Sequence, residues 1–122
     1  QAAQSLVGSV DAIFCPNDSV VQAAMPQIAQ IAREAKIPVY GSSAVMVNSG
    51  AFATISISDT EIGAISADMA DQILKGTPVS EVPAKFVDVF TTVINQNTAD
   101  AIGASLSDDV KASAVLVEDS AQ

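Results

Sequence analysis

Short apolar runs alternate with amphipathic helical segments in the first half of this chain of 122 residues. The runs at 10–15, 37–40 and 51–57 are near-continuously apolar, whereas 20–35 and 58–75 repeat apolar residues every three or four positions, as one helix face does. Near-continuous apolar strands joined by helices are typical of a parallel sheet covered by helices on both faces. The predicted fold class is therefore α/β, with a three-layer, doubly wound and mostly parallel sheet.

The remaining elements are predicted from turn and capping residues. Residues 1–8 resemble the end of a helix that stops at Gly8, and the abrupt start predicts a fragment that begins within an element. Pro26 predicts a kink or a restart near Met25, because proline removes an amide donor and clashes with the preceding turn. Ser58 and Glu61 have the spacing of a helix capping box. Residues 44–50 are expected to be irregular.

One partial domain is predicted over residues 1–122, because the length suits a single compact unit. Its parts are a lobe core at 1–76, an extended connector at 77–84 with two prolines, and a C-terminal strand and helices at 85–122. The C-terminal part holds a β-prone run at 86–94, a short helix to residue 102 and a last helix from Ser107. The periodicities predict a core that includes Ile13, Ile31, Val39, Ile55, Ile65, Met69 and Ile73.

Composition excludes several classes of function. Fourteen acidic and five basic side chains give a net charge of −9, which disfavours nucleic acid and anionic membranes as partners. The chain has no His, which closes Ser-His catalysis and His-ligated zinc within it. Cys15 stands in an apolar run and is expected to be a core residue. No catalytic residue, metal site or cofactor is predicted, and the acidic pairs 108–109 and 118–119 are expected to be solvated.

Polar residues follow three of the predicted strands. Because the carboxyl ends of parallel strands meet at one edge of the sheet, these clusters are expected to converge where such folds bind ligands. Taken singly, Asp18 and Ser58 are also ordinary helix caps, and Ser42 and Ser43 ordinary turn residues. Hydroxyls, an amide and carboxylates suit a small polar or zwitterionic molecule. The predicted ligand-binding residues are Asn17, Asp18, Ser19, Ser42, Ser43, Ser58 and Asp59.

An ordered set of segments resembles one known family. The segments are VDAIFCPND at 10–18, IAREAKIPVY at 31–40, GAFAT at 50–54, EIG at 61–63, ILKG at 73–76, VIN at 93–95 and AIG at 101–103. Together they resemble the extracytoplasmic substrate-binding proteins of ABC transporters that include tryptophan- and tyrosine-type binding proteins.

The resemblance implies one incomplete lobe of a type I periplasmic binding protein, which clamps its ligand between two lobes. It implies an ABC permease and ATPase as partners and an extracytoplasmic, periplasmic or lipid-anchored location. The family's acidic residue after the first strand falls on Asp18, and Gly63 matches a family glycine. Ser43 stands where the family usually has an acidic residue, and Ser58 where it often has an aspartate. Asp59 and Thr60 stand where aromatic residues are common, so a smaller ligand, or one recognised more through hydroxyls, is implied.

Two other functions share this architecture and stay open at the level of sequence. One is the effector-binding half of a transcription regulator, and the other is a doubly wound enzyme whose catalytic group comes from elsewhere. An upstream secretory or lipoprotein signal would favour transport, and a basic helix-turn-helix would favour regulation. Because one flank of the sheet is expected to be uncovered, the chain is also predicted to be only marginally stable or to form a homodimer.

Overall fold

The computed structural model describes residues 1–119 and divides the chain into two compact units. Unit 1 holds residues 1–56 together with the chain from residue 92, and unit 2 holds residues 57–91. Unit 2 is therefore inserted in the sequence of unit 1. Helix α5 (Asp59–Leu74) falls in unit 2, whereas the division expected from the sequence grouped it with residues 1–76.

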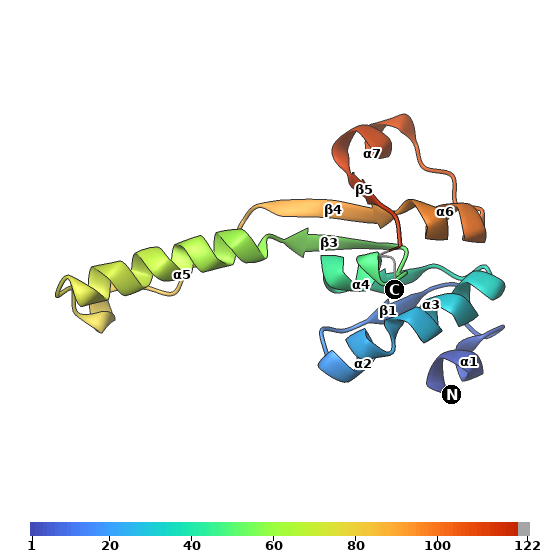
Figure 1. Cartoon of the computed structure of the whole chain (residues 1–122), viewed down its shortest axis with the longest axis horizontal. Coiled ribbons are helices and arrows are strands. Elements are labelled where there is room, and N and C mark those ends of the chain that lie inside the picture. Colours follow the sequence, from blue (N-terminus) through green and yellow to red (C-terminus); the bar gives the residue numbers. More distant parts are fainter. Residues whose placement is uncertain (120–122) are drawn as a thin grey trace. The chain divides into compact units, whose positions relative to one another are not determined.

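A five-stranded, mostly parallel sheet has the strand order β1-β2-β3-β4-β5 (Figure 1). The β1–β2, β2–β3 and β4–β5 pairs are parallel. The amide of Asn95, the last residue of β4, donates to the carbonyl oxygen of Phe52, just before β3 (2.9 Å), so these two neighbours run in opposite directions. The predicted α/β class is confirmed. The strands are β1 (Ile13–Cys15), β2 (Val39–Gly41), β3 (Ala53–Ile57), β4 (Phe90–Asn95) and β5 (Val115–Val117).

The helices follow the sequence signals closely where those signals are local. Helix α2 ends and α3 begins around Ala24, with Pro26 in the first turn of α3, so the predicted restart near Met25 is confirmed. The Oγ of Ser58 accepts from the Glu61 amide (3.3 Å) and caps α5 as predicted. The helices are α1 (Ala2–Leu6), α2 (Ser19–Ala23), α3 (Met25–Glu34), α4 (Ala44–Asn48), α5 (Asp59–Leu74), α6 (Gln96–Ile102) and α7 (Asp108–Ser113), with a 3-10 turn η1 (Val79–Glu81).

Two elements differ from the expectation. Residues 44–50, expected to be irregular, contain α4, and β5 was not foreseen. Five residues are too few to form a stable helix by propensity alone. Helix α4 instead depends on the full burial of Met46 and Val47 against the sheet.

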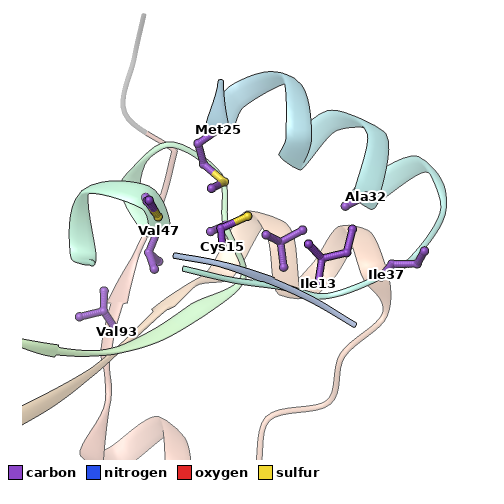
Figure 2. Close-up of a cluster of buried hydrophobic side chains, with 10 residues drawn as sticks. Ile13, Cys15, Met25, Ala32, Ile37, Val47 and Val93 are labelled. Carbon is purple, nitrogen blue, oxygen red and sulfur yellow. The ribbon is translucent and has the colours of Figure 1, made fainter. Parts of the chain in front are cut away.

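The core of unit 1 lies between one face of the sheet and helices α3 and α4. Figure 2 shows the Ile13 and Cys15 side chains of β1 directed toward α3, from which Met25 and Ala32 meet them. Each large aliphatic side chain buried in this way contributes about 1.5–3 kcal/mol of transfer free energy. The buried residues of this core are Ile13, Cys15, Met25, Ala32, Ile37, Val39, Met46, Val47, Ala51 and Val93.

Five predicted core residues are at least partly buried, and two are not. Ile13 and Val39 are buried, and Ile31, Ile65 and Met69 are partly buried. The predictions for Ile55 and Ile73 are wrong, because these residues are 70% and 38% exposed.

The open face of the sheet explains the exposure of Ile55. Thr54 and Ser56 point to the covered face and are buried, so Ile55 between them points the other way. Phe14 and Tyr40, paired across β1 and β2, are 69% and 41% exposed. Within unit 1, this face of the sheet is therefore apolar and exposed.

Unit 2 has no core of its own. None of its residues is buried, so its apolar side chains, Ile73 among them, have no core within unit 2 to pack into. An ion pair on the surface of unit 2 joins Lys85, in the chain that follows α5, to Asp68 within α5, with 3.2 Å between Nζ and Oδ2. Among the described residues, no helix is long and apolar enough to cross a membrane.

Candidate functional site

The first polar cluster follows β1 and begins α2. Asp18 is the N-cap of α2, and its Oδ1 accepts from the amides of Val20 (2.8 Å) and Val21 (3.0 Å). Both hydrogen bonds leave the carboxylate exposed, together with Asn17 and Ser19. The interpretation of Asp18 as a helix cap is confirmed, and its negative charge is still open to solvent or to a ligand.

The second cluster follows β2 and begins α4. Ser43 is the N-cap residue of α4, but its side chain caps no amide. Its Oγ is buried with no hydrogen-bond partner among the described residues, whereas Ser42 Oγ contacts Met46 Sδ at 3.7 Å. A buried hydroxyl without a partner costs about 1–3 kcal/mol. Ser43 Oγ is therefore an unsatisfied polar atom, enclosed by its neighbours, where β2 passes into α4.

The strand register brings these two clusters together. Cys15 and Gly41, the last residues of β1 and β2, are direct partners in the parallel ladder. Because the strands end side by side, Asn17–Ser19 and Ser42–Ser43 leave the sheet at the same edge. That edge is the ligand-binding edge of open parallel sheets.

The third cluster lies in unit 2. Ser58 is the N-cap of α5 and Asp59 is its first residue, and both are exposed. Their convergence with Asp18 and Ser43 remains a prediction. The five other candidate residues all belong to unit 1.

The chemistry of this edge suits binding. Within residues 1–119, no group of three His, Cys, Asp or Glu side chains is arranged to hold a metal ion. Burial raises the pKa of the Cys15 thiol, which keeps it protonated and poorly nucleophilic. Hydroxyls, one amide and one exposed carboxylate can donate to and accept from a small polar molecule.

A polar cluster that sequence reasoning missed lies elsewhere in unit 1. Asp119 is exposed, as expected, but it also forms a bidentate ion pair with Arg33: Nη2 to Oδ1 (2.7 Å) and Nη1 to Oδ2 (2.8 Å). The Arg33 hydrogen bonds, aided by one from Asn95, hold the pKa of Asp119 below its ordinary value. Nothing in the sequence indicated this ion pair, because Arg33 stands 86 positions earlier.

The family follows from a match over almost the whole chain. Residues 1–118 match the family model described as ABC transporter substrate binding protein. The chain belongs to the ABC transporter substrate-binding protein family. A curated relative is a tyrosine-binding protein of Clostridioides difficile (strain R20291), 33% identical over 102 residues, which are 84% of this chain and 30% of that protein.

Solved structures of similar proteins have the same fold. One is a ligand-free, open structure of a substrate binding protein with adhesive properties from Clostridium difficile, with a TM-score of 0.82 and 31% identity. The match covers 98% of the present chain and 40% of the chain of that solved structure. Another, from Streptococcus pneumonia, is an ABC domain in complex with L-Trp, with a TM-score of 0.83, 26% identity, and coverage of 94% and 39%.

The chain corresponds to only part of the length of its relatives. The chain spans 30% of the curated relative and about 40% of the solved ones. The resemblance to this family, expected from the ordered segments at 10–18 through 101–103, is confirmed. Two of these relatives are described as a tyrosine-binding protein and as a substrate binding protein.

Proposed function

We propose that this chain is one lobe of the substrate-binding component of an ABC importer, and that the component captures a small polar solute such as an amino acid. The observation that carries the proposal is the family match over residues 1–118. The relatives support an amino acid in particular, because one is a tyrosine-binding protein and another is solved with L-Trp. The importer's permease and ATPase are the proposed protein partners, and the proposed location is extracytoplasmic.

Two uncovered surfaces support a two-lobed arrangement. The sheet face with Phe14, Tyr40 and Ile55 is open, and unit 2 buries none of its residues. Parallel sheets are normally covered on both faces, and helix α5 depends on packing for most of its stability. The larger relatives carry about 60% of their length outside the match, which is polypeptide enough to cover both surfaces.

Within this proposal, the ligand binds in unit 1 at the edge of the sheet where β1 and β2 end. The residues at this edge are Asn17, Asp18, Ser19, Ser42 and Ser43. The Asp18 carboxylate pairs with the ammonium group of an amino acid, and the serine hydroxyls offer donors and acceptors to the amino acid's other polar groups. Ser58 and Asp59, at the start of α5, are proposed ligand residues as well. Charge-assisted hydrogen bonds of this kind contribute about 1.5–3 kcal/mol.

The test uses two substitutions of Asp18 in a two-lobed protein that contains this chain. Asp18→Asn keeps an acceptor oxygen for the Val20 and Val21 amides but removes the charge, whereas Asp18→Ala removes both. We expect both to weaken L-tyrosine or L-tryptophan binding by calorimetry by about 1.5–3 kcal/mol, while only Asp18→Ala lowers stability. An unchanged dissociation constant in both variants would reduce Asp18 to a helix cap.

The chain alone is expected to bind such ligands only weakly. A clamp buries most of a small ligand between two surfaces, and one lobe offers a single open face. Calorimetry of the 122-residue chain with L-tyrosine should therefore give a dissociation constant weaker than about 1 mM, and micromolar affinity would contradict the clamp. Sedimentation equilibrium of the same sample tests the proposed homodimer, which a stable monomer at high concentration would contradict.

A further inference from the structure

A cluster of four polar side chains joins segments that are far apart in the sequence of unit 1. The cluster, here called the clasp, consists of Arg33 in α3, Asn95 at the end of β4, Thr98 in α6 and Asp119 after β5. Arg33 precedes the insertion of residues 57–91, and the three others follow it. The clasp therefore connects the two separate pieces of chain that make unit 1.

Asn95 is the centre of the clasp. It is fully buried, and its Nδ2 donates to the carbonyl oxygen of Val47 (2.9 Å) and to Asp119 Oδ1 (2.8 Å). Its Oδ1 accepts from the Thr98 amide (2.9 Å) and caps α6. A buried amide that is satisfied on both ends defines the position of its partners closely, since any shift leaves a buried polar atom unpaired.

Arg33 and Thr98 extend the clasp to the loop after α4. The Thr98 hydroxyl accepts from Arg33 Nε (3.0 Å) and Nη2 (2.5 Å), and it donates to the carbonyl oxygen of Gly50 (2.8 Å). Val47 and Gly50 bound the C-terminal turn of α4. The clasp thus holds the C-terminal end of the helix whose N-cap is Ser43.

The clasp adds to the packing that holds helix α4. The helix has five residues and no side-chain cap, so beyond the burial of Met46 and Val47 its position depends on the contacts at its C-terminal end. We infer that Arg33 is a positioning residue: through Thr98, Asn95 and Asp119 it fixes α4 against the returning strand β4, and so fixes Ser42 and Ser43. The anchoring itself stands on contacts within unit 1, and only its benefit for a ligand rests on the proposed function.

Hydrogen exchange of the 122-residue chain measured by NMR tests the anchoring without any ligand. The reporters are the amides of Thr98, bonded to Asn95 Oδ1, and of Gly50, bonded to the Val47 carbonyl. The reference is the amide of Ile13, bonded to the Pro38 carbonyl in the β1–β2 region. In Arg33→Met we expect the reporters to exchange at least tenfold faster relative to Ile13.

Two further variants keep the test sharp. Arg33→Lys retains the charge but not the planar fork that contacts Thr98 and Asp119 together, so it should show an intermediate acceleration. Lys75→Met also removes one cation, from a pair with Asp71 at 2.7 Å that is exposed on unit 2, and it should leave the reporters unchanged.

The outcomes separate anchoring from general stability. If hydrogen exchange at the Ile13, Gly50 and Thr98 amides is accelerated equally in Arg33→Met, Arg33 only stabilises unit 1 as a whole. If exchange is not accelerated at any of them, the clasp does not hold α4. Either result overturns the inference. If Arg33→Met does not fold, the Arg33→Lys comparison decides by the same criterion. If Arg33→Met accelerates exchange of the reporters as expected but leaves ligand binding by a two-lobed protein unchanged, the anchoring stands and the proposed function of Ser42 and Ser43 is contradicted.

Discussion

Gly50 is the position where a single methyl group is expected to be most costly. Its φ is +108°, a conformation that L side chains rarely adopt. A Cβ built there would lie 2.8 Å from the Cβ of Ala29 in α3 and 3.2 Å from Nη2 of Arg33. The backbone penalty is about 1–3 kcal/mol, and overpacking against α3 adds about 1–3 kcal/mol. We therefore expect Gly50→Ala to lower the free energy of unfolding by about 2–6 kcal/mol.

The matched control is Gly8→Ala. Gly8 has a φ of +78°, but nothing lies within 4 Å of a Cβ built on it. Its substitution should therefore cost only the backbone penalty of about 1–2 kcal/mol. Urea denaturation followed by circular dichroism gives both values, provided that the slopes of the transitions agree.

A rescue experiment isolates the steric part of the Gly50 effect. Ala29→Gly removes the methyl group that the new Cβ would meet, at a cost of about 1 kcal/mol for glycine in a helix. In the double variant we expect the two changes to couple by about 1–3 kcal/mol in the stabilising direction. Additive effects, or a Gly50→Ala cost no larger than that of Gly8→Ala, would refute the reasoning from close packing.

Three further predictions concern single side chains. The folded-state pKa of Asp119 is lowered, so the contribution of Asp119 to stability is present above its ordinary pKa of 3.8 and is lost as the pH falls through the lowered value. Urea denaturation at neutral and acid pH measures this loss, and the fall in the urea midpoint on acidification should be smaller in Asp119→Asn than in the unchanged protein. Thr54→Val removes a buried hydroxyl with no partner among the described residues, so it should raise the free energy of unfolding, measured with urea, by up to about 1 kcal/mol. A loss of stability would show that the hydroxyl is satisfied. Gly63→Ala lies within α5 with nothing near its Cβ, so it should increase the helical circular dichroism signal by favouring α5 by about 1 kcal/mol, and a decrease would show that the position needs glycine.

Local signals in the sequence predicted much of the fold and part of the candidate site. Apolar runs and helical periodicity placed three parallel strands, the helical segment between the first two and the helix after the third, because side-chain spacing of two or 3.6 residues is a property of the local backbone. Pro26 predicted the break between α2 and α3, and Asp18 and Ser58 were predicted as caps, since proline and capping side chains act within one turn. The meeting of Asp18 and Ser43 at one sheet edge followed from the parallel order of β1 and β2.

Other features were decided by contacts between distant parts of the chain. Helix α4 forms where the sequence has little helical signal, because Met46 and Val47 are buried by tertiary packing. The exposure of Ile55 depends on which face of the sheet is covered, and periodicity alone does not contain that information. Arg33 and Asp119 are 86 positions apart, and only the fold of unit 1 brings them within 2.7 Å. The sequence by itself determines most of the strands and helices. The formation of α4 and β5, the burial of each face and the pairing of distant charges come from the tertiary structure, because those energies arise only when separate segments pack together.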